Sequence, residues 1–112
     1  MAAEDDAGCS LRALMDGLLA TRSDLVDPMG AAVIAAAHLD LCHDSRTFAR
    51  IFGVAHALVI RAVTTLSDEA GLLEVEHRSE RSQRIRYRLT SRGQALAAPV
   101  AAWASARPAT EA

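Results

Sequence analysis

The sequence predicts a mainly α-helical domain that carries a small two-stranded β-ribbon, and two features of its 112 residues predict it. Up to about residue 70, apolar side chains recur at the spacing that is typical of amphipathic helices. After Gly71 the apolar residues alternate with polar ones, which indicates strands. A chain of this length with 51% apolar residues suits one domain with one core.

Four helices are expected before the ribbon, and the first three of them follow a local start signal. Small polar residues can accept hydrogen bonds from the first free N–H groups of a helix, and a proline fits its first turn. An acidic, loose tail is expected over 1–9. The expected helices are 10–22 with Ser10 as N-cap, about 28–42 with Asp27 as N-cap and Pro28 in the first turn, 45–53 with Ser45 as N-cap, and about 55–70.

Residues 72–77 and 84–90 are expected to form the two strands of the ribbon. A period of two places successive side chains on opposite faces, so the second strand has one apolar and one basic face. The apolar face holds Ile85, Tyr87 and Leu89, and the basic face holds Arg84, Arg86 and Arg88. Thr90 is expected to cap a last helix that Pro99 kinks or restarts. The domain then covers 10–106, and 107–112 form a frayed tail.

Residues 47–66 have the pattern of two helices joined by a tight turn. Such a unit needs a small residue at the crossing and, four places later, a residue that tolerates positive φ. Ala49 and Gly53 have this spacing. A helix-turn-helix followed by a β-ribbon is the winged-helix arrangement. Apolar residues occupy the positions expected to be interior, namely Phe48, Phe52, Val54, Val59 and Ala62.

The charges are unevenly distributed. A net charge of −2 alone argues against a nucleic-acid partner. Residues 1–44, however, contain eight acids and two arginines, whereas residues 78–92 contain six arginines and one acid, Glu80. Such a block is typical of a surface that attracts a polyanion. No apolar run reaches the ~18 residues of a membrane span, and two cysteines make no disulfide framework, so we expect a cytoplasmic protein that does not enter membranes.

Residues 46–98 resemble the winged-helix core of MarR-type bacterial transcription regulators. The stretches that carry the resemblance are FARIFGV, LVIRAVTTLSDEAGLLEVEHR and RIRYRLTSRGQAL, the last with LT-x-x-G after a charged strand. The resemblance implies a homodimer that binds double-stranded DNA, with a recognition helix in the major groove and a wing on the backbone or minor groove. It also implies dimerisation through the first and last helices. Independently of the resemblance, Trp103 and the 11–19 apolar stripe are expected to be packing or dimer contacts.

The sequence departs from this family in three ways. The Asp-x-Arg that the family often carries near its wing tip is matched by Arg81 and Gln83, so the Asp is absent. The recognition helix is one residue longer before Gly71, and the chain is shorter than typical members. The shorter chain leaves less sequence for a second C-terminal helix at the dimer interface.

The expected recognition helix offers few groups for reading bases. Its buried stripe is expected to be Leu58, Val59, Ala62, Val63 and Leu66. On the other face Arg61 can donate two hydrogen bonds to guanine or contact a phosphate, and apolar groups can touch thymine methyls. Most affinity would then come from phosphate contacts, which weaken with salt. The expected DNA-contacting residues are Arg46, Thr47, Arg50, His56, Ala57, Ile60, Arg61, Thr64, Arg78, Arg81, Gln83, Arg84 and Arg86.

The basic wing, Arg61 and His56 each have a plainer explanation than DNA binding. The basic wing can be a charged strand edge that resists pairing with other chains. Arg61 can be a surface ion-pair partner, and His56 an ordinary surface residue. The competing function is a winged helix that binds another protein, with the acidic first half of the chain meeting the partner.

Two cysteines and two histidines raise the question of a metal or redox role. His38 and Cys42 are four residues apart on an expected helix, which suits two zinc ligands, with His77 or Cys9 as further ligands. Cys42 is better explained as a small buried apolar residue, and redox sensing by either cysteine would need a lowered pKa. We expect no metal and no cofactor, and a small-molecule or redox effector stays open. No catalytic motif is visible, so an enzyme is not expected.

Overall fold

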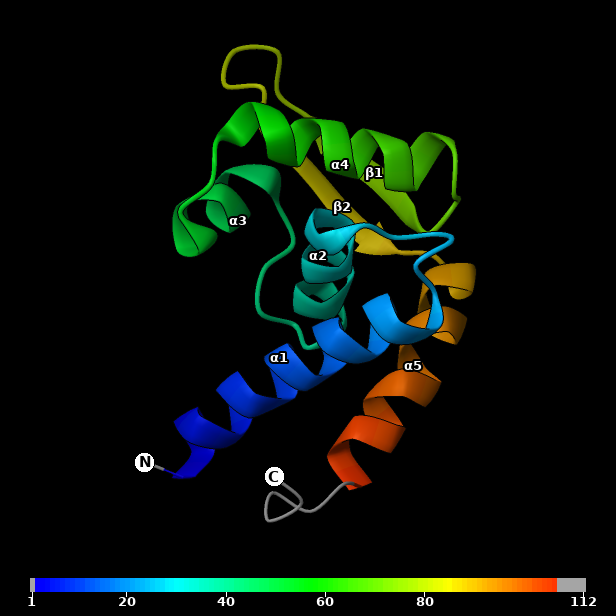
Figure 1. The fold of residues 1–112 in the computed structure, drawn as a ribbon. Coiled ribbons are helices and arrows are strands. Elements are labelled where there is room, and N and C mark those ends of the chain that lie inside the picture. Colours follow the sequence, from blue (N-terminus) through cyan, green and yellow to red (C-terminus); the bar gives the residue numbers. More distant parts are fainter. Residues whose placement is uncertain (1, 107–112) are drawn as a thin grey trace.

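The structure is a computed structural model that describes the backbone of residues 2–106 and the side chains of residues 11–104 (Figure 1). Within this part of the chain, helices dominate and one antiparallel sheet of two strands follows the fourth helix. The predicted fold class, mainly helical with a β-ribbon in a winged-helix order, is confirmed. The elements are α1 (Ala2–Thr21), α2 (Pro28–His38), α3 (Ser45–Phe52), α4 (His56–Asp68), β1 (Leu73–Arg78), β2 (Ile85–Leu89) and α5 (Ser91–Ala106).

Helix α2 is the centre of the core. Every residue from 30 to 37 is buried, and α1, α4, α5 and β2 all contact the helix. Its start matches the prediction, since Asp27 Oδ1 accepts a hydrogen bond from the Gly30 N–H at 2.7 Å and Pro28 lies in the first turn. Its end does not. The helix stops at His38 rather than near Cys42, because Asp40 takes a left-handed conformation with φ of 64° that no helix continues.

Helix α1 begins at Ala2 rather than at Ser10, so the predicted loose tail is wrong for most of its length. Alanine is the best helix former, and two alanines begin this segment of the sequence. Helices α1 and α5 pack against each other within the chain. They pack so closely that a Cβ added at Gly17 would lie 2.5 Å from Val100 Cγ1.

Helices α3 and α4 form the predicted helix-turn-helix. Gly53 ends α3 in the left-handed conformation with φ of 66°, and Ala49 is buried, as expected. Phe48 and Val59 are fully buried, and the other three predicted interior residues, Phe52, Val54 and Ala62, are half-buried. The N-cap of α3 is Asp44, not Ser45. The Ser45 hydroxyl makes other hydrogen bonds, so the preceding carboxylate takes the cap.

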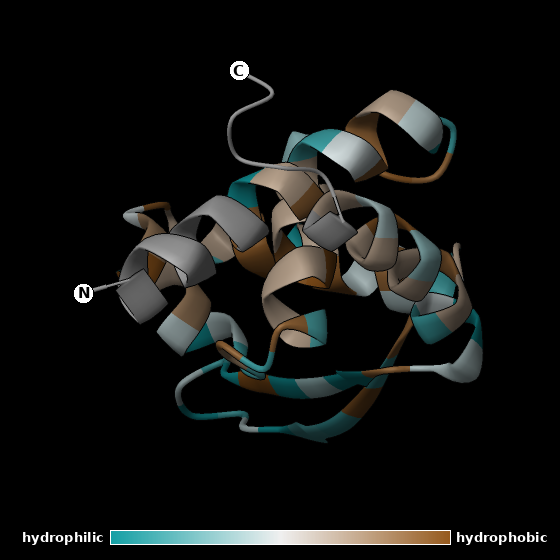
Figure 2. Cartoon of the chain, turned by 90° about the horizontal axis from the view of Figure 1, so that it is seen from below, coloured by the Kyte–Doolittle hydropathy of each residue, from teal (hydrophilic) through white to brown (hydrophobic). Residues whose placement is uncertain are grey.

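The ribbon matches the prediction closely. Leu73 pairs with Leu89 and Arg78 with Ile85, with a bulge between Val75 and His77. Hydrophilic and hydrophobic residues alternate along the strands (Figure 2). The apolar side chains of β2 (Ile85, Tyr87, Leu89) are buried and its arginines (Arg84 just before it, Arg86, Arg88) are exposed.

The last helix is capped as predicted, since Thr90 Oγ1 accepts a hydrogen bond from the Gly93 N–H at 3.0 Å. The predicted restart at Pro99 does not occur, because α5 runs through this proline without interruption. Pro99 and Ala95 are exposed, so water can satisfy the Ala95 carbonyl that the proline leaves without a partner. Residues 107–112, predicted to fray, lie outside the described residues. No helix within residues 2–106 has the length and apolarity to cross a membrane.

Candidate nucleic-acid interface

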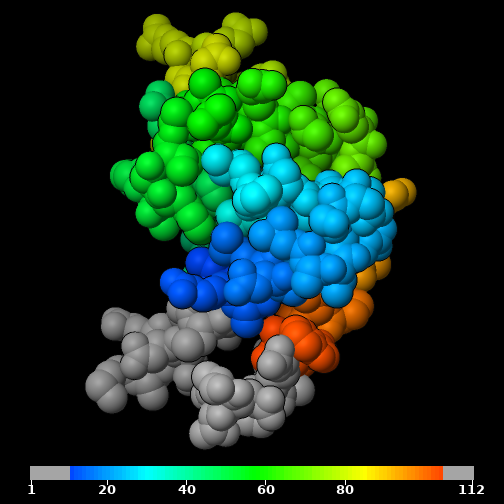
Figure 3. Space-filling model, in the orientation of Figure 1, coloured from blue at the N-terminus to red at the C-terminus, as the bar shows by residue number. Residues whose placement is uncertain are grey.

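The turn between the strands lies beside the start of α3. Arg46 donates a hydrogen bond from its guanidinium to the Ser82 carbonyl at 3.2 Å, which joins α3 to this turn. Backbone bonds close the turn, from the Ser79 N–H to the Arg84 carbonyl at 2.9 Å and from the Gln83 N–H to the Ser79 carbonyl at 2.8 Å. The turn stands out beyond the surface of α4 as the yellow projection of Figure 3. The wing and the helix-turn-helix therefore share one end of the molecule (Figure 1).

The arginines near the wing fall into two groups. Arg84 lies 3.6 Å from an Asp44 oxygen, and Arg88 lies 2.7 Å from Glu74 and 3.7 Å from Glu76, so these two are partly neutralised. The second group is exposed and makes no side-chain hydrogen bond or ion pair with any residue that the structure describes. It consists of Arg78, Arg81 and Arg86 of the ribbon, Arg50 of α3 and Arg61 of α4.

Two uncharged residues among the predicted contacts, Thr47 and Gln83, are also engaged within the chain. The Thr47 N–H and hydroxyl both bond the Asp44 carboxylate at 2.8 Å, so the hydroxyl belongs to the α3 cap. The Gln83 amide bonds the Glu80 carbonyl at 3.0 Å, and Gln83 itself has a φ of 62°. Thr47 therefore has no free donor, whereas the exposed Gln83 keeps one amide hydrogen that is not used.

Asp44 is the acid at the centre of this basic region. Partial burial acts to raise the pKa of its carboxyl, but the hydrogen bonds from Thr47 and the positive charge of Arg84 outweigh burial and leave the pKa lowered. Asp44 is therefore ionised at neutral pH, and its charge offsets part of the repulsion between Arg46 and Arg84.

His56 is a half-buried residue with an internal partner, not a free surface group. Its Nε2 lies 2.8 Å from the Ser45 hydroxyl. Burial and then the charge of Arg46 lower the pKa of His56, against the opposing charge of Asp44, with Arg84 lowering it further. The neutral form of His56 is thus favoured at pH 7. His56, predicted as a DNA contact, has its Nε2 engaged with the Ser45 hydroxyl.

The exposed face of α4 is rotated from the predicted one. Val59, Val63 and Leu66 form the buried stripe, and at about 100° per residue this stripe turns Leu58 outward. Leu58, predicted to be buried, is 50% exposed, whereas Ile60 and Thr64, predicted to be exposed, are half-buried. The face open to a partner is Ala57, Leu58, Arg61, Thr65 and Asp68. The prediction misses Leu58 and Thr65 because the spacing of Leu58 to Ala62 and Leu66 also fits a buried stripe, which displaces the predicted exposed face by one residue.

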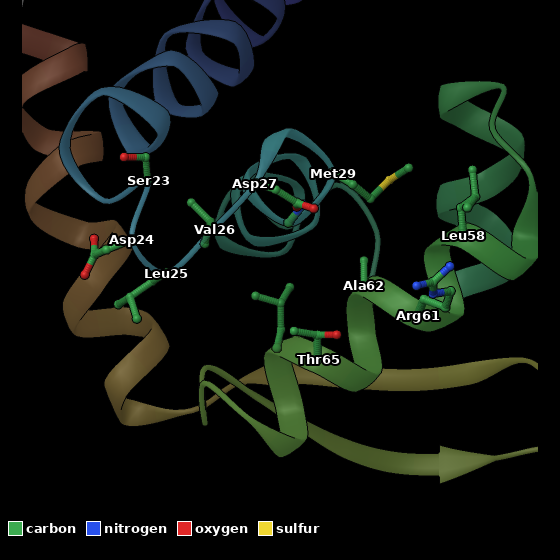
Figure 4. Close-up of a pocket in the computed structure, with 12 residues that line it drawn as sticks. Ser23, Asp24, Leu25, Val26, Asp27, Met29, Leu58, Arg61, Ala62 and Thr65 are labelled. Atoms are coloured by element: carbon green, nitrogen blue, oxygen red, sulfur yellow. The ribbon is translucent and has the colours of Figure 1, made fainter.

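Arg61 lies at the border of a hollow of about 530 Å³ (Figure 4). Leu58 and Thr65 of α4 form one wall with Arg61, and residues 23–30 form the other, with Asp24 and Asp27 among them. Arg61 and Leu58 lie on the side of α4 away from the strands in this view. Arg61, the single arginine of α4, therefore lies between the basic surface near the wing and the more acidic surface that Asp24 and Asp27 line.

The described residues considered for a metal or redox role do not come together in a site. Because α2 ends at His38, Cys42 lies beyond the helix and the expected zinc-ligand spacing on one helix does not arise. Among the described side chains, no three residues of the His, Cys, Asp and Glu types lie close enough to hold a metal ion. Burial, followed by the charge of Asp44, raises the pKa of the Cys42 thiol, opposite to the shift that redox sensing needs. The Cys9 side chain lies outside the described residues.

Part of the surface predicted for dimerisation is buried within the chain itself. Leu14 and Leu18 of the 11–19 stripe are buried in the core of the same chain. A groove of about 460 Å³ remains between α1 and α5, lined mainly by apolar atoms of residues such as Ala20, Val100 and Trp103. Trp103 is 53% exposed.

Comparison with protein-family models, curated proteins and solved structures finds no match for this chain. The case for its function therefore depends on the surface described above.

Proposed function

We propose that the protein binds double-stranded DNA and regulates transcription, with α4 in the major groove and the wing on the phosphate backbone. The observation that carries this proposal is the projecting turn between β1 and β2. It places Arg81 beside the start of α3, while Arg50, Arg78 and Arg86 stay exposed on the flanking elements. Exposed arginines on a projecting hairpin beside a helix-turn-helix match the shape and charge of a duplex.

The start of α4 adds to this surface. Its N-cap is Ala55, and no side chain caps the helix. The first N–H groups of an uncapped helix, together with the helix dipole, favour a phosphate. Arg46 lies near this helix start, since the preceding residue, Ser45, lies 2.8 Å from His56 Nε2 through its hydroxyl. A backbone phosphate at this position would orient α4 in the groove.

Base reading by α4 is expected to be modest. Of its exposed residues only Arg61 can make a bidentate contact with guanine, and Leu58 and the Thr65 methyl group can touch thymine methyls. One bidentate contact is worth about 1–3 kcal/mol of discrimination. Most of the affinity then comes from phosphate contacts, at about 0.9 log unit per contact for each tenfold change in salt. We further propose a cytoplasmic homodimer that reads an inverted repeat.

The test is a salt series with mixed genomic DNA fragments, measured by fluorescence anisotropy for wild type, Arg81→Ala and Arg88→Ala. Arg81 is unpaired within the described residues, whereas Arg88 already contacts Glu74 and Glu76, so Arg88→Ala is the matched control. We expect Arg81→Ala to weaken binding to all sequences and to reduce the salt slope by about 0.9, and Arg88→Ala to change neither. No binding by the wild type contradicts DNA binding, and a salt slope that Arg81→Ala leaves unchanged contradicts the contact between the wing and the phosphate backbone.

A protein-interaction module is the second candidate, and one observation favours it. Leu58 is half exposed next to the hollow that Asp24 and Asp27 line. An apolar side chain beside acids on an open surface suits a protein partner better than a phosphate. Under this alternative, wild-type DNA binding is absent or independent of salt.

A further inference from the structure

The buried hydroxyl of Ser45 is unusual in this molecule. Apart from Tyr87 and Cys42, Ser45 is the one buried residue with a hydrogen-bonding side chain among those that the structure describes, and it is 0% exposed. A hydroxyl is buried at low cost only when its hydrogen bonds are made. The partners of Ser45 therefore indicate what it does.

Ser45 Oγ joins the first residues of three elements. It is the first residue of α3, its oxygen accepts a hydrogen bond from the Ile85 N–H at 2.9 Å, and it lies 2.8 Å from His56 Nε2. Ile85 begins β2, and His56 begins α4. Three elements thus begin at the hydrogen bonds of the Ser45 hydroxyl: α3, which carries Arg46, α4, which carries Arg61, and β2 of the wing.

The backbone cannot supply the acceptor that Ser45 provides. On the edge of β2 away from β1, the Tyr87 N–H bonds the His43 carbonyl at 3.0 Å. Asp44 then bridges to Arg86, after which the chain turns into α3. The next N–H along this edge, that of Ile85, meets the Ser45 side chain instead of a carbonyl. Without the hydroxyl this buried N–H has no partner among the described residues.

The direction of the hydrogen bonds follows from counting protons. The Ile85 amide can only donate, so Ser45 Oγ accepts from it and has one proton to give. A hydroxyl oxygen has a second lone pair and could also accept from a protonated Nε2, but its own buried proton would then have no acceptor among the described residues. We therefore assign that proton to His56 Nε2, as the acceptor nitrogen of a neutral imidazole protonated on Nδ1. The charged groups that act on this ring are Asp44, Arg46 and Arg84, and burial with the two arginines disfavours the imidazolium. The surroundings are consistent with the neutral ring.

We propose that Ser45 is the positioning residue that sets the wing against the recognition helix, through the chain from the Ile85 N–H to the Ser45 hydroxyl to His56 Nε2. This inference depends on the proposed DNA binding, because the value of the arrangement is that Arg46, Arg61 and the wing reach one duplex together. Ser45 itself is buried and contacts no DNA.

The first part of the test needs no DNA. We compare Ser45→Ala with Ser91→Ala, a matched control in which an exposed serine at the first position of α5 is replaced. In Ser45→Ala the Ile85 amide should exchange with solvent about tenfold faster or more, because it loses a buried acceptor. The pKa of His56, followed by NMR, should rise, because the hydroxyl that bonds the neutral ring is gone. Unchanged Ile85 exchange and an unchanged His56 pKa in a folded Ser45→Ala variant overturn the proposal.

A second pair of variants changes His56, the acceptor of the Ser45 hydroxyl. This pair tests the positioning role even if Ser45→Ala does not fold. His56→Gln keeps an acceptor near the Nε2 position for the Ser45 hydroxyl, whereas His56→Ala removes it. Backbone relaxation should show wild-type order of the wing and of the start of α4 in His56→Gln and greater motion in His56→Ala. Equal order in the two variants contradicts the positioning role.

The last part measures DNA affinity across a salt series. Ser45→Ala should bind about tenfold more weakly than wild type near 0.1 M salt, with a slope lower by one contact or more at about 0.9 each, and Ser91→Ala should match wild type. If wild type binds DNA and Ser45→Ala binds with the same affinity and slope, the positioning role fails while DNA binding stands. If wild type does not bind DNA, the proposed function fails, and Ile85 exchange still reports on the hydrogen-bond chain.

Discussion

The two ends of α4 lie in opposite electrostatic surroundings. At its start, His56 lies among Arg46, Arg84 and the projecting wing turn. Towards its end, Asp68 and Glu69 are exposed, and the neighbouring hollow is lined by Asp24 and Asp27. A duplex carries a dense line of negative charge, so it is attracted to the first end and repelled by the second. The contrast predicts that DNA lies along the wing and the first two turns of α4, with Arg61 at the limit of the contact.

Reversing charge at the basic end has the largest expected effect. The variant Arg46→Glu/Arg81→Glu loses two phosphate contacts and adds two repulsive charges, so affinity should fall by about a hundredfold or more near 0.1 M salt. Fluorescence anisotropy with labelled duplex measures the loss. Arg88→Glu is a control on the paired part of the ribbon, and an equal loss in that variant would show that only net charge matters.

Removal of the Arg61 side chain should change sequence preference more than overall affinity. A bidentate contact with guanine supplies about 1–3 kcal/mol of discrimination, and Arg61→Ala removes it. Binding of a selected DNA motif and of the same motif with single base-pair changes measures the preference. An Arg61→Ala variant that weakens all sequences equally would place Arg61 on a phosphate rather than a base.

Asp44 provides a test of stability at the basic end. Asp44→Ala should lower the free energy of unfolding by about 0.5–2 kcal/mol through loss of the α3 cap. The folded pKa of Asp44 is lowered, so its contribution is complete above the unfolded pKa near 4 and is lost as pH falls through the folded value. Urea unfolding of wild type and Asp44→Ala should therefore differ at pH 7 and converge near pH 2. If the difference in the free energy of unfolding stays constant across this range, Asp44 stabilises the fold through its cap hydrogen bonds and not through its charge.

The smallest expected effect comes from the acidic end. Asp68→Asn removes one exposed negative charge beyond the proposed contact, so DNA affinity should rise by less than about threefold, as for other exposed charges. Anisotropy at low salt measures the change most sensitively. A rise of tenfold or more would mean that the duplex reaches the end of α4, and the proposed contact would have to be extended.

Much of the fold follows from local sequence. Pro28 after Asp27, Gly53 four residues after Ala49, and the alternation around Tyr87 each depend on a few neighbouring residues, and the structure agrees with all three. The α3 cap is different, because it depends on a tertiary contact. Ser45 was expected to cap α3 because of its residue type, but its hydroxyl bonds a strand forty residues away.

The candidate site was predicted less well, for the same reason. Its charges are visible in the sequence, but the pairing of Arg88 with Glu74 and of Arg84 with Asp44 depends on strand register and on how α3 meets the ribbon. The predicted orientation of α4 is off by one residue, because the spacing of Leu58 to Ala62 and Leu66 also fits a buried stripe. Burial of Val59 and Val63 sets that orientation, and burial of an individual side chain depends on which helices surround it.

The most direct test is an NMR titration of the protein with a short DNA duplex, with backbone amides as probes. If DNA contacts the basic end of α4, chemical shifts should move for residues 46–61 and for the wing turn 79–84. Residues 23–29 and 65–69 should stay near their starting positions. Shifts confined to the second set, or to the groove between α1 and α5, would contradict the account.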